Sequence, residues 1–461
     1  MTNVSIINAP DDVNFEADAG VWPPLGSLRV ALSAKNLGAN VIFIDGQHHT
    51  SLDDVIRQVD PDTKIAGITF NRVTMPTVRP LIQGLLEKGV KQIVVGGQAV
   101  IPIAETFVSD LADLRVMACY GDGEPTIKGL VKGDDLSEIP NLTFFDGSTV
   151  RKTSEQLIDY TSLGVLRYAQ IEGFDWQNYF KISHKVFDDG KNRASVYFAD
   201  GCPRRIKKGC SFCARRNTGV IRTMSPKDAY NQLLHLKEKG ADTVNIESDT
   251  FFSDIHFLEE LANIMESRGN LRLGLDVYGG VSELNQKSLN LAERLGVSSI
   301  LVGVESGNKE IRRINGKYFT DKRMFETAEE CRKRGIRYDP AFVLGMIGET
   351  DETAIETVGV ARKLVSKGYC NKVYASLFMP FPGSPAYDLI QKKLQSSPAL
   401  NEKFGYQFNR WDYDWSKLID AQVEIMTSTS RKHLCSCLDK MKNFGNYARP
   451  VMGNYSVSEG D

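Results

Sequence analysis

The chain lacks any apolar run near the roughly 20 residues that a helix needs to cross a bilayer. It also lacks an excess of either charge: Lys and Arg total 56, Asp and Glu total 58, and the formal net charge is −2. An overall basic field that would attract nucleic acid or a membrane is therefore absent, although local patches remain possible. The first residues carry no basic region and too short an apolar core for a signal peptide. We therefore expect a cytoplasmic protein with no membrane and no nucleic-acid partner.

Cysteine is sparse, with eight residues in 461. In a reducing compartment such cysteines are expected to be free thiols or metal ligands rather than disulfides. Three of them, Cys202, Cys210 and Cys213, fall within twelve residues. The remaining composition, 42% hydrophobic and 25% charged, is that of an ordinary globular protein. The crowded cysteines are therefore the feature that needs an explanation.

Residues 1–145 alternate short apolar strands with amphipathic helices. The expected strands are residues 4–7, 41–44, 65–70 and 93–95. Each is β-branched and nearly continuous in apolar residues, as strands buried on both faces of a parallel sheet are. The pattern predicts an α/β, doubly wound, Rossmann-like sheet. Glycine turns such as Gly96–Gly97 follow the strands, where ligands of such sheets bind, and ordinary tight turns are the alternative.

The rest of the chain predicts a barrel and a cap. Residues 146–193 lose periodicity and are interpreted as a linker. Six strands and five helices then alternate, which predicts a partial (βα)6 TIM-type barrel over residues 194–390. The expected strands are residues 194–199, 243–246, 271–277, 299–304, 338–344 and 372–378, and the expected helices are residues 226–239, 257–267, 283–295, 321–335 and 351–368. Residues 391–461 lose the strand pattern, hold a helical stretch over residues 416–441, and are expected to form a mainly helical C-terminal cap.

The three clustered cysteines follow the first expected barrel strand in the spacing C-x7-C-x2-C. Three thiolates on one loop suit zinc or an iron–sulfur cluster. A structural zinc ion needs a fourth ligand, and the nearest histidines, His184 and His235, are each about twenty residues away. A cluster held by three cysteines instead leaves one iron free for a small ligand, which is the chemically more useful interpretation.

A strand followed by three cysteines ending in Cys-x-aromatic-Cys, at the start of a six-strand βα barrel, resembles the radical S-adenosylmethionine (SAM) superfamily. Most members have C-x3-C-x2-C, so this chain lengthens the first loop by four residues and keeps the Cys210–Cys213 pair. The resemblance implies that Cys202, Cys210 and Cys213 hold a [4Fe-4S] cluster. It also implies that Phe212 shields the cluster and the adenine of SAM, with core packing as the alternative.

Four further segments match the family in order. Residues 246–252 look like the segment that binds the SAM amino group, and residues 303–307 resemble G-[IV]-E-S-G. Residues 342–350 resemble the fifth-strand glycine motif beside the adenine, and residues 378–385 resemble the sixth-strand P-x-P-G-[ST]. The residues that the resemblance assigns to SAM are Glu247, Ser248, Asp249, Glu305, Ser306, Gly345, Glu349 and Pro380. Buried ion pairing is the alternative role for Asp249 and Glu305.

The front of the chain extends the resemblance. Residues 23–26, 94–97 and 121–124 occur in the same order in radical SAM proteins with an N-terminal cobalamin-binding domain. This implies a cobalamin-binding-type domain over residues 1–145, with Gly96 and Gly97 at its ligand face. The D-x-H-x-x-G segment that elsewhere supplies an axial histidine is absent, and Asn8 and the next four residues stand there instead. Cobalamin binding is therefore left open.

The resemblance implies reductive cleavage of SAM to a 5'-deoxyadenosyl radical that modifies a small-molecule substrate, with cobalamin-dependent methylation as one form. A flavodoxin- or ferredoxin-type protein would supply the electron. One alternative is transfer of the 3-amino-3-carboxypropyl group of SAM without cobalamin. Another alternative is a non-catalytic iron–sulfur protein with a binding or sensing role.

Three other groups of residues invite a functional interpretation. The bases of the cysteine loop could hold an anionic substrate or raise the cluster potential, but solvated loop charges are favoured; they are Arg204, Arg205, Lys207, Lys208, Arg215 and Arg216. Cys435 and Cys437 could bind a soft ion, but on a helix at this spacing their thiols diverge. Trp411, Tyr413 and Trp415 could line a substrate cavity, and aromatic anchoring of the cap is favoured.

Overall fold

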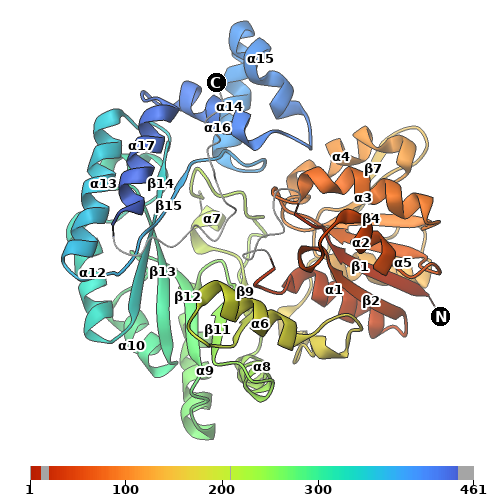
Figure 1. Ribbon diagram of the computed structural model, residues 1–461, viewed down its shortest axis with the longest axis horizontal. Helices are drawn as coiled ribbons and strands as arrows, with labels where there is room; N and C mark the ends of the chain where they lie inside the picture. Colours follow the sequence, from red (N-terminus) through yellow and green to blue (C-terminus); the bar gives the residue numbers. More distant parts are fainter. Residues whose placement is uncertain (1, 12–19, 208, 445–461) are drawn as a thin grey trace. The chain divides into compact units, whose positions relative to one another are not determined.

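The computed structural model describes residues 2–11, 20–207 and 209–444, and it divides into two compact units (Figure 1). Unit 1 comprises Met1–Phe198, Arg222–Asn245 and Asn409–Asp412, and unit 2 comprises Ala199–Ile221, Ile246–Phe408 and Tyr413–Asp461. The division into four segments expected from the sequence stays a prediction. Lys208 and the expected end of the cap, residues 445–461, lie outside the described residues.

Unit 1 contains a seven-stranded sheet in the order β2-β1-β3-β4-β5-β6-β7. Its strands are β1 (Asn3–Asn8), β2 (Asn40–Asp45), β3 (Ile65–Thr69), β4 (Gln92–Gly96), β5 (Met117–Cys119), β6 (Leu142–Phe145) and β7 (Val150–Lys152). The first five pair in parallel, and β6 and β7 add an antiparallel edge. The order 2-1-3-4-5 is a doubly wound arrangement whose strand order reverses between β1 and β3. The predicted Rossmann-like fold is confirmed.

Three of the α-helices of unit 1 begin at residues whose side chains cap them. The α-helices of unit 1 are α1 (Leu25–Lys35), α2 (Leu52–Gln58), α3 (Met75–Glu87), α4 (Ala104–Asp110), α5 (Gly123–Lys132), α6 (Trp176–Phe187) and α8 (Pro226–Glu238), with short 3-10 helices η1 (Gly46–His48), η2 (Ile101–Ile103), η3 (Ala112–Leu114), η4 (Tyr160–Ser162) and η5 (Tyr168–Gln170). Side chains of Ser51, Asp175 and Ser225 accept backbone N–H groups at the starts of α2, α6 and α8.

The predicted half-barrel is a six-stranded sheet in the order β15-β14-β13-β12-β11-β8. Its strands are β8 (Arg193–Val196), β11 (Thr243–Ile246), β12 (Gly274–Gly280), β13 (Val297–Glu305), β14 (Arg337–Leu344) and β15 (Tyr374–Leu377). The pairs among β12, β13, β14 and β15 are parallel. Helices α9 (Ile255–Arg268), α10 (Gln286–Arg294), α11 (Lys309–Ile314), α12 (Asp321–Lys333) and α13 (Asp351–Ser366) separate the later strands, and β9 (Ala199–Asp200), α7 (Pro203–Lys207), β10 (Arg222–Thr223) and η6 (Phe251–Ser253) are short.

The C-terminal part is helical, but the single helical stretch expected over residues 416–441 is wrong. The structure has α14 (Pro385–Ser396), α15 (Pro398–Phe404), η7 (Gly405–Asn409), α16 (Trp415–Met426) and α17 (Arg431–Lys442), and α17 packs beside α13 (Figure 1). The chain breaks after α16 because its backbone pairs with the loop after β14. Gly348 N–H donates to the Met426 carbonyl, and Ser428 N–H donates to the Glu349 carbonyl, both at 2.8 Å.

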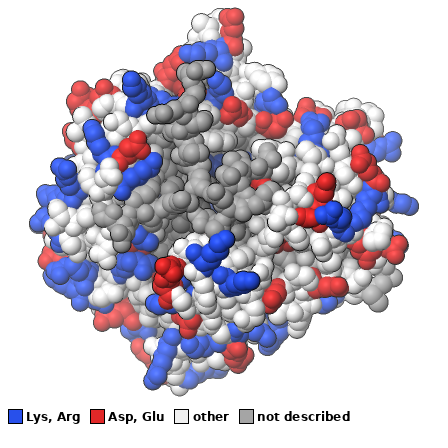
Figure 2. Space-filling model, in the orientation of Figure 1, with Lys and Arg blue, Asp and Glu red and all other residues white. Residues whose placement is uncertain are grey.

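Charges of both signs are interspersed over the face of the molecule shown in Figure 2. This agrees with the net charge of −2. Among the described helices, none has the length and apolar character required to span a membrane.

A buried charge cluster holds the start of α5 in unit 1. Arg29 pairs with Glu124 at 2.6 Å and donates to the Tyr160 hydroxyl at 2.9 Å. Burial would lower the pKa of Arg29, but Glu124 and Tyr160 raise it above its ordinary value. Arg222 lies 4.7 Å from the centre of the same Tyr160 ring and pairs with Asp122. The two acids of the 121–124 motif therefore each hold a guanidinium group.

We expect Glu124→Gln to lower the free energy of unfolding by about 3 kcal/mol or more, because it leaves the buried Arg29 without a counter-charge. Urea unfolding of the whole chain, followed by circular dichroism, measures the change. The double variant Arg29→Met with Glu124→Leu removes both charges and should lie closer to the wild type. Equal losses in the two variants would mean that the packing of these side chains matters more than their charge.

Candidate functional site

The three cysteines lie on one loop that follows β9. Cys202 stands directly before α7, and Cys213 N–H donates to the Cys210 carbonyl at 3.1 Å, which closes a turn. Gly201 at the start of the loop has a φ of +104°, and a Cβ there would lie 2.5 Å from the Val220 carbonyl oxygen. The chain can therefore enter the loop only through a glycine.

Segments from two other strand ends press on the second half of this loop. Ser211 N–H donates to the Asn315 carbonyl at 3.3 Å, and its hydroxyl contacts Asn315 Oδ1 at 2.5 Å. Ala386 N–H donates to the Ser211 carbonyl at 2.9 Å. A Cβ on Gly316 would lie 2.8 Å from the Gly209 carbonyl oxygen. Residues that follow β13 and β15 thus fix the backbone around Cys210.

The thiols sit in an environment that disfavours bare thiolates. Burial raises the pKa of Cys210 to about 11, and it also raises the pKa of Cys213. A metal that binds these sulfurs must therefore displace protons, as metal sites generally do. Across the described ranges, no three His, Cys, Asp or Glu side chains converge as ligands of a single metal ion. A four-iron cluster offers a separate iron to each of three sulfurs.

A buried ion pair lies next to the loop. Lys317 Nζ is 2.8 Å from Glu305 Oε1, and both side chains are 9% exposed. Burial would lower the pKa of Lys317, but the charges of Glu305 and Cys210 outweigh it and the pKa is raised. The ammonium group also lies 5.6 Å from the centre of the Phe212 ring. Sequence reasoning missed Lys317, because no motif of the resemblance includes it.

The backbone around Glu305 is shaped for this pair. Glu305 has a φ of +68°, which is uncommon for a residue other than glycine. A Cβ on Gly303 would lie 2.4 Å from Glu305 Oε1 and 2.9 Å from Lys317 Nζ. The absence of a side chain at Gly303 therefore leaves the space that the side chains of Glu305 and Lys317 occupy.

Ser306 and Gly307, which follow Glu305, dock the next helices. The Thr357 hydroxyl contacts the Ser306 hydroxyl at 3.2 Å and accepts from Gly307 N–H at 2.9 Å. Both carbonyls accept from Arg312, whose side chain is fully buried and pairs with Asp321. Ser306 is itself fully buried. Its role toward SAM stays a prediction, since its described contacts are structural.

The segment after β11 anchors the start of the cysteine loop. Asp249 Oδ2 accepts from Gly201 N–H at 3.1 Å, and Ser248 Oγ accepts from Ala199 N–H at 3.0 Å. Arg215 Nε lies 3.1 Å from Asp249 Oδ1. Burial raises the pKa of Asp249, against the opposing charge of Arg215. Ion pairing, the alternative expected for Asp249, is present in the structure, and the neighbouring Glu247 is partly exposed.

Glu349 holds the turn after β14. Its Oε2 accepts from the N–H groups of Gly345 and Met346, and Gln422 donates to the Gly345 carbonyl at 3.0 Å. The carboxyl is fully buried, and among the described residues neither Glu349 Oε1 nor Gln422 Oε1 has a hydrogen-bond partner. Burial raises the pKa of Glu349 to about 7. The carboxyl therefore titrates near neutral pH, whatever its role toward SAM.

Phe212 and Pro380 lie at an apolar part of the site. Phe212 packs against the buried group Ile311, Met346, Phe378 and Ala386. Its ring meets that of Phe378 edge-on, with centres 6.4 Å apart. Pro380 is buried nearby in the sequence. Core packing, the alternative expected for Phe212, is thus present beside the cysteine loop.

Solvated charges were favoured for most bases of the cysteine loop, and three of these bases have partners in the structure. Arg204 pairs with Glu283 at 3.0 Å, and Arg205 donates to the carbonyls of Arg215 and Gly383 at 2.9 and 3.0 Å. Arg215 pairs with Asp249, as described above. These side chains hold the loop because its backbone carbonyls have few partners in regular structure.

The remaining aromatic and thiol candidates are structural where their contacts are described. In unit 1, Trp411 packs edge-on against Phe107 with ring centres 4.7 Å apart and donates to Asp110 at 2.8 Å. In unit 2, Cys437 is fully buried on α17 while Cys435 is partly exposed, so the two thiols do diverge. Aromatic burial, which was favoured for Trp411, agrees with these contacts.

At the edge of the unit 1 sheet where a ligand is predicted to bind, the backbone after β4 lies close to the end of β3. Gly97, after β4, has a φ of +104°, and a Cβ there would lie 3.1 Å from Thr69 Cγ2. Asn8, at the end of β1, donates to Asp45 Oδ1 at 2.8 Å, and Tyr179 donates to Asp45 Oδ2 at 2.6 Å. Asn8, which stands where the histidine segment occurs in other proteins of this kind, therefore uses its side-chain amide to bond to the neighbouring strand.

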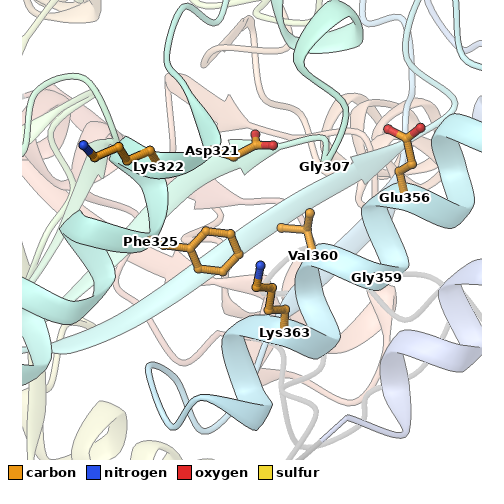
Figure 3. Close-up of a pocket in the computed structure, with 8 residues that line it drawn as sticks. All are labelled: Gly307, Asp321, Lys322, Phe325, Glu356, Gly359, Val360 and Lys363. Carbon is orange, nitrogen blue, oxygen red and sulfur yellow. The ribbon is translucent and has the colours of Figure 1, made fainter.

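A surface pocket in unit 2 is separate from this site. Its cavity of about 490 Å³ lies between α12 and α13, where Lys363 reaches over the Phe325 ring at 4.8 Å (Figure 3). Among its lining residues, only Gly307 belongs to a motif described above. We assign it no role in the chemistry.

Comparisons with known proteins agree with this geometry. Residues 196–361 match the family model of the radical SAM superfamily. The chain is 23% identical over 346 residues to "Uncharacterized protein MJ1620" of Methanocaldococcus jannaschii, and the match covers 67% of this chain and 66% of that protein, just under two thirds.

Two solved structures share the fold. TsrM of Kitasatospora setae, a radical SAM methyltransferase with cobalamin and a [4Fe-4S] cluster bound, gives a TM-score of 0.69 at 16% identity, covering 86% of this chain and 75% of that one. OxsB, a cobalamin-dependent SAM radical enzyme with aqua-cobalamin and SAM bound, gives a TM-score of 0.69 at 15% identity. The match covers 86% of this chain and 61% of that one. At such identities the likeness is one of fold.

We expect Glu349→Gln to become more stable relative to the wild type as pH rises. A carboxyl whose pKa is raised by folding favours the folded state while protonated, and that advantage is lost as pH rises from about 4.5 through about 7. The difference should approach about 3 kcal/mol above pH 8. Melting temperatures at pH 5.5, 7.0 and 8.5 measure it, with the exposed Glu402→Gln as control. A pH-independent difference would contradict the raised pKa.

Proposed function

We propose that this chain, a radical SAM protein by its domain at residues 196–361, binds a [4Fe-4S] cluster and cleaves SAM to modify a small-molecule substrate. The observation that carries the proposal is the cysteine loop itself. Its three cysteines lie on one loop after β9, its backbone is held from two other strand ends, and the buried Lys317 acts on the pKa of Cys210.

The donor set fits such a cluster. Cys202, Cys210 and Cys213 would bind three irons, which leaves the fourth iron open to the amino and carboxylate groups of SAM. When bound, the cluster and SAM supply reductive cleavage to a 5'-deoxyadenosyl radical that takes a hydrogen atom from the substrate. The chain's own contribution begins with charge. Burial raises the pKa of Cys210, and Lys317, itself paired with Glu305, opposes that rise.

The apolar side chains around Phe212 would keep water away from the reaction. Phe212 packs on Phe378 and Met346, which are buried, so one side of the cysteine loop presents hydrocarbon. Radical chemistry needs a site that excludes competing reactions. Glu349 and Gln422 then act indirectly, because they fix the turn at Gly345 that carries this apolar surface.

We extend the proposal to cobalamin in the front domain. Doubly wound sheets bind ligands at the strand-order reversal, here the carboxyl ends of β1 and β3, and Gly96 and Gly97 lie on the same edge. TsrM and OxsB, which share the fold, have cobalamin bound. Asn8 would hold the β1 end through Asp45 rather than bind the metal. Methylation of the substrate is the reaction that this pairing of cofactors favours.

The proposal is tested by anaerobic reconstitution with iron and sulfide. We expect an absorption and EPR signature of a [4Fe-4S] cluster and formation of 5'-deoxyadenosine from SAM with dithionite. Cys202→Ala, Cys210→Ala and Cys213→Ala should each lower deoxyadenosine formation at least about a hundredfold, because each removes a ligand of the cluster. Cys435→Ala, a thiol outside the loop, is the matched control.

Other outcomes would redirect the assignment. Methylthioadenosine as the main product would favour transfer of the 3-amino-3-carboxypropyl group. A stable cluster with bound SAM and no cleavage under reduction would favour a binding or sensing protein. Tightly bound zinc without a cluster would overturn the proposal. Added methylcobalamin tests the front domain separately, through a methylated product.

A further inference from the structure

The inner face of the half-barrel, which is the face of β12–β15 turned away from α10, α12 and α13, is partly open (Figure 1). Burial alternates along β13 and β14: one set of side chains is buried, and the other set, which includes Leu301 and Ala341, is only half-buried. Tyr338 marks the outer face, because burial and Cys331 of α12 raise its pKa. Successive side chains of a strand point to opposite faces, so Asp339 belongs to the inner face.

The inner face carries charged side chains where the interior of a barrel is usually filled by branched apolar ones. Ser299 on β13 donates to Asp276 Oδ1 on β12. Arg337 Nη2 on β14 lies 3.9 Å from the same Asp276 oxygen, and Arg337 Nε donates to Asp339 Oδ2 at 2.8 Å. These four residues therefore form one polar group across three neighbouring strands of unit 2.

Asp339 has one oxygen to spare. Its side chain is in a residue that is only 3% exposed, yet among the described residues its Oδ1 has no hydrogen-bond partner. Burial raises the pKa of this carboxyl, against the opposing charges of Arg337 and Lys372. A buried acceptor without a donor costs free energy of folding. The carboxyl can therefore take one more donor, and it is held in position by Arg337 before that donor arrives.

This free acceptor lies close to the part of the site that adjoins the cysteine loop. Leu301 is level with Asp339 in the register of β13 and β14, and Gly303 is two residues further along β13. The side chains of Glu305 and Lys317 occupy the space over Gly303. Two residues of a strand span about 7 Å. Asp339 is thus one layer of side chains deeper in the half-barrel than the buried ion pair.

We infer that Asp339 is a specificity-determining residue whose Oδ1 accepts from the ammonium group of an amine substrate. The inference rests on the proposed function, because it takes the inner face as the place where the substrate lies. Oδ2 stays with Arg337, which orients the carboxyl. Tyr374 lies beside the same group, since burial and Asp339 raise its pKa, and its half-buried hydroxyl is a second polar contact for the amine.

Other classes of substrate fit this polar group less well. An anionic substrate would have to compete with Asp276 and Asp339 for the guanidinium of Arg337. An apolar substrate would leave Asp339 Oδ1 without a donor. A neutral hydroxyl could reach the same oxygen, but a hydrogen bond between two charged groups is about twice as strong as one between neutral groups. An amine is therefore the substrate class that the inner face favours.

The experiment compares three small probes of one shape: n-butylamine, n-butanol and butyrate. Each is titrated by calorimetry into the reconstituted full-length protein with SAM and without reductant. We expect the wild type to bind n-butylamine at least about tenfold more tightly than either other probe, and Asp339→Asn to lose this preference, because an amide N–H replaces the free acceptor. Asp134→Asn, which changes an exposed acid in unit 1, is the matched control and should keep the preference.

Melting temperatures separate recognition from a structural role. Asp339→Asn should melt at or above the wild-type temperature, because a neutral amide costs less to bury than a carboxylate with a free oxygen. Tyr374→Phe, which removes only a hydroxyl, should weaken n-butylamine binding about threefold and leave the melting temperature unchanged. This second variant keeps the inference testable if Asp339→Asn does not fold.

Three results would overturn the inference. Equal n-butylamine affinity in the wild type and both variants, with normal 5'-deoxyadenosine formation, would remove it and leave the proposed function intact. A melting temperature several degrees lower in Asp339→Asn, with the amine preference retained, would give the carboxyl a structural role only. No 5'-deoxyadenosine from the wild type, with the amine preference present, would remove the proposed function and with it the assignment of the amine as a substrate.

Discussion

The buried pair of Lys317 and Glu305 is the constraint from which the rest of the site follows. Two opposite charges at 2.8 Å with 9% exposure stabilise the fold only while both are present, since either one alone would be a buried, uncompensated charge. The pair needs Gly303 for space and a positive φ at Glu305. It also fixes the segment through Gly316, which packs on the cysteine loop. The geometry of the thiols and the charge next to them therefore have a common origin.

Several motif residues assigned to SAM by resemblance have structural contacts of their own. Asp249 accepts from Gly201 N–H, Ser306 docks α13, and Glu349 ties down the turn at Gly345. These roles do not compete with cofactor binding, because a site must hold its ligand-facing groups in place before the ligand arrives. They do explain why such side chains are acidic or hydroxylic: buried N–H groups at strand ends need acceptors.

The sequence predicted what depends on local patterns. The barrel strands were found because β-branched runs repeat between amphipathic helices, and the cysteines because they crowd within twelve residues. Strands β5, β6 and β7 were missed, since runs of three or four residues carry little periodicity. Lys317 and the break after α16 could not be predicted, because each is set by a long-range contact: Lys317 by Glu305, and the break by the turn at Gly348.

Charge in this region is divided between inner and outer roles. Lys317 and Arg312 are buried, each with a carboxylate partner, and Arg204 and Arg215 hold the loop through Glu283 and Asp249. These paired charges are fixed in position, so their field acts on the thiols without reorganisation. Because each of these cations is held by a carboxylate, the loop around Cys210 is positioned before any ligand arrives.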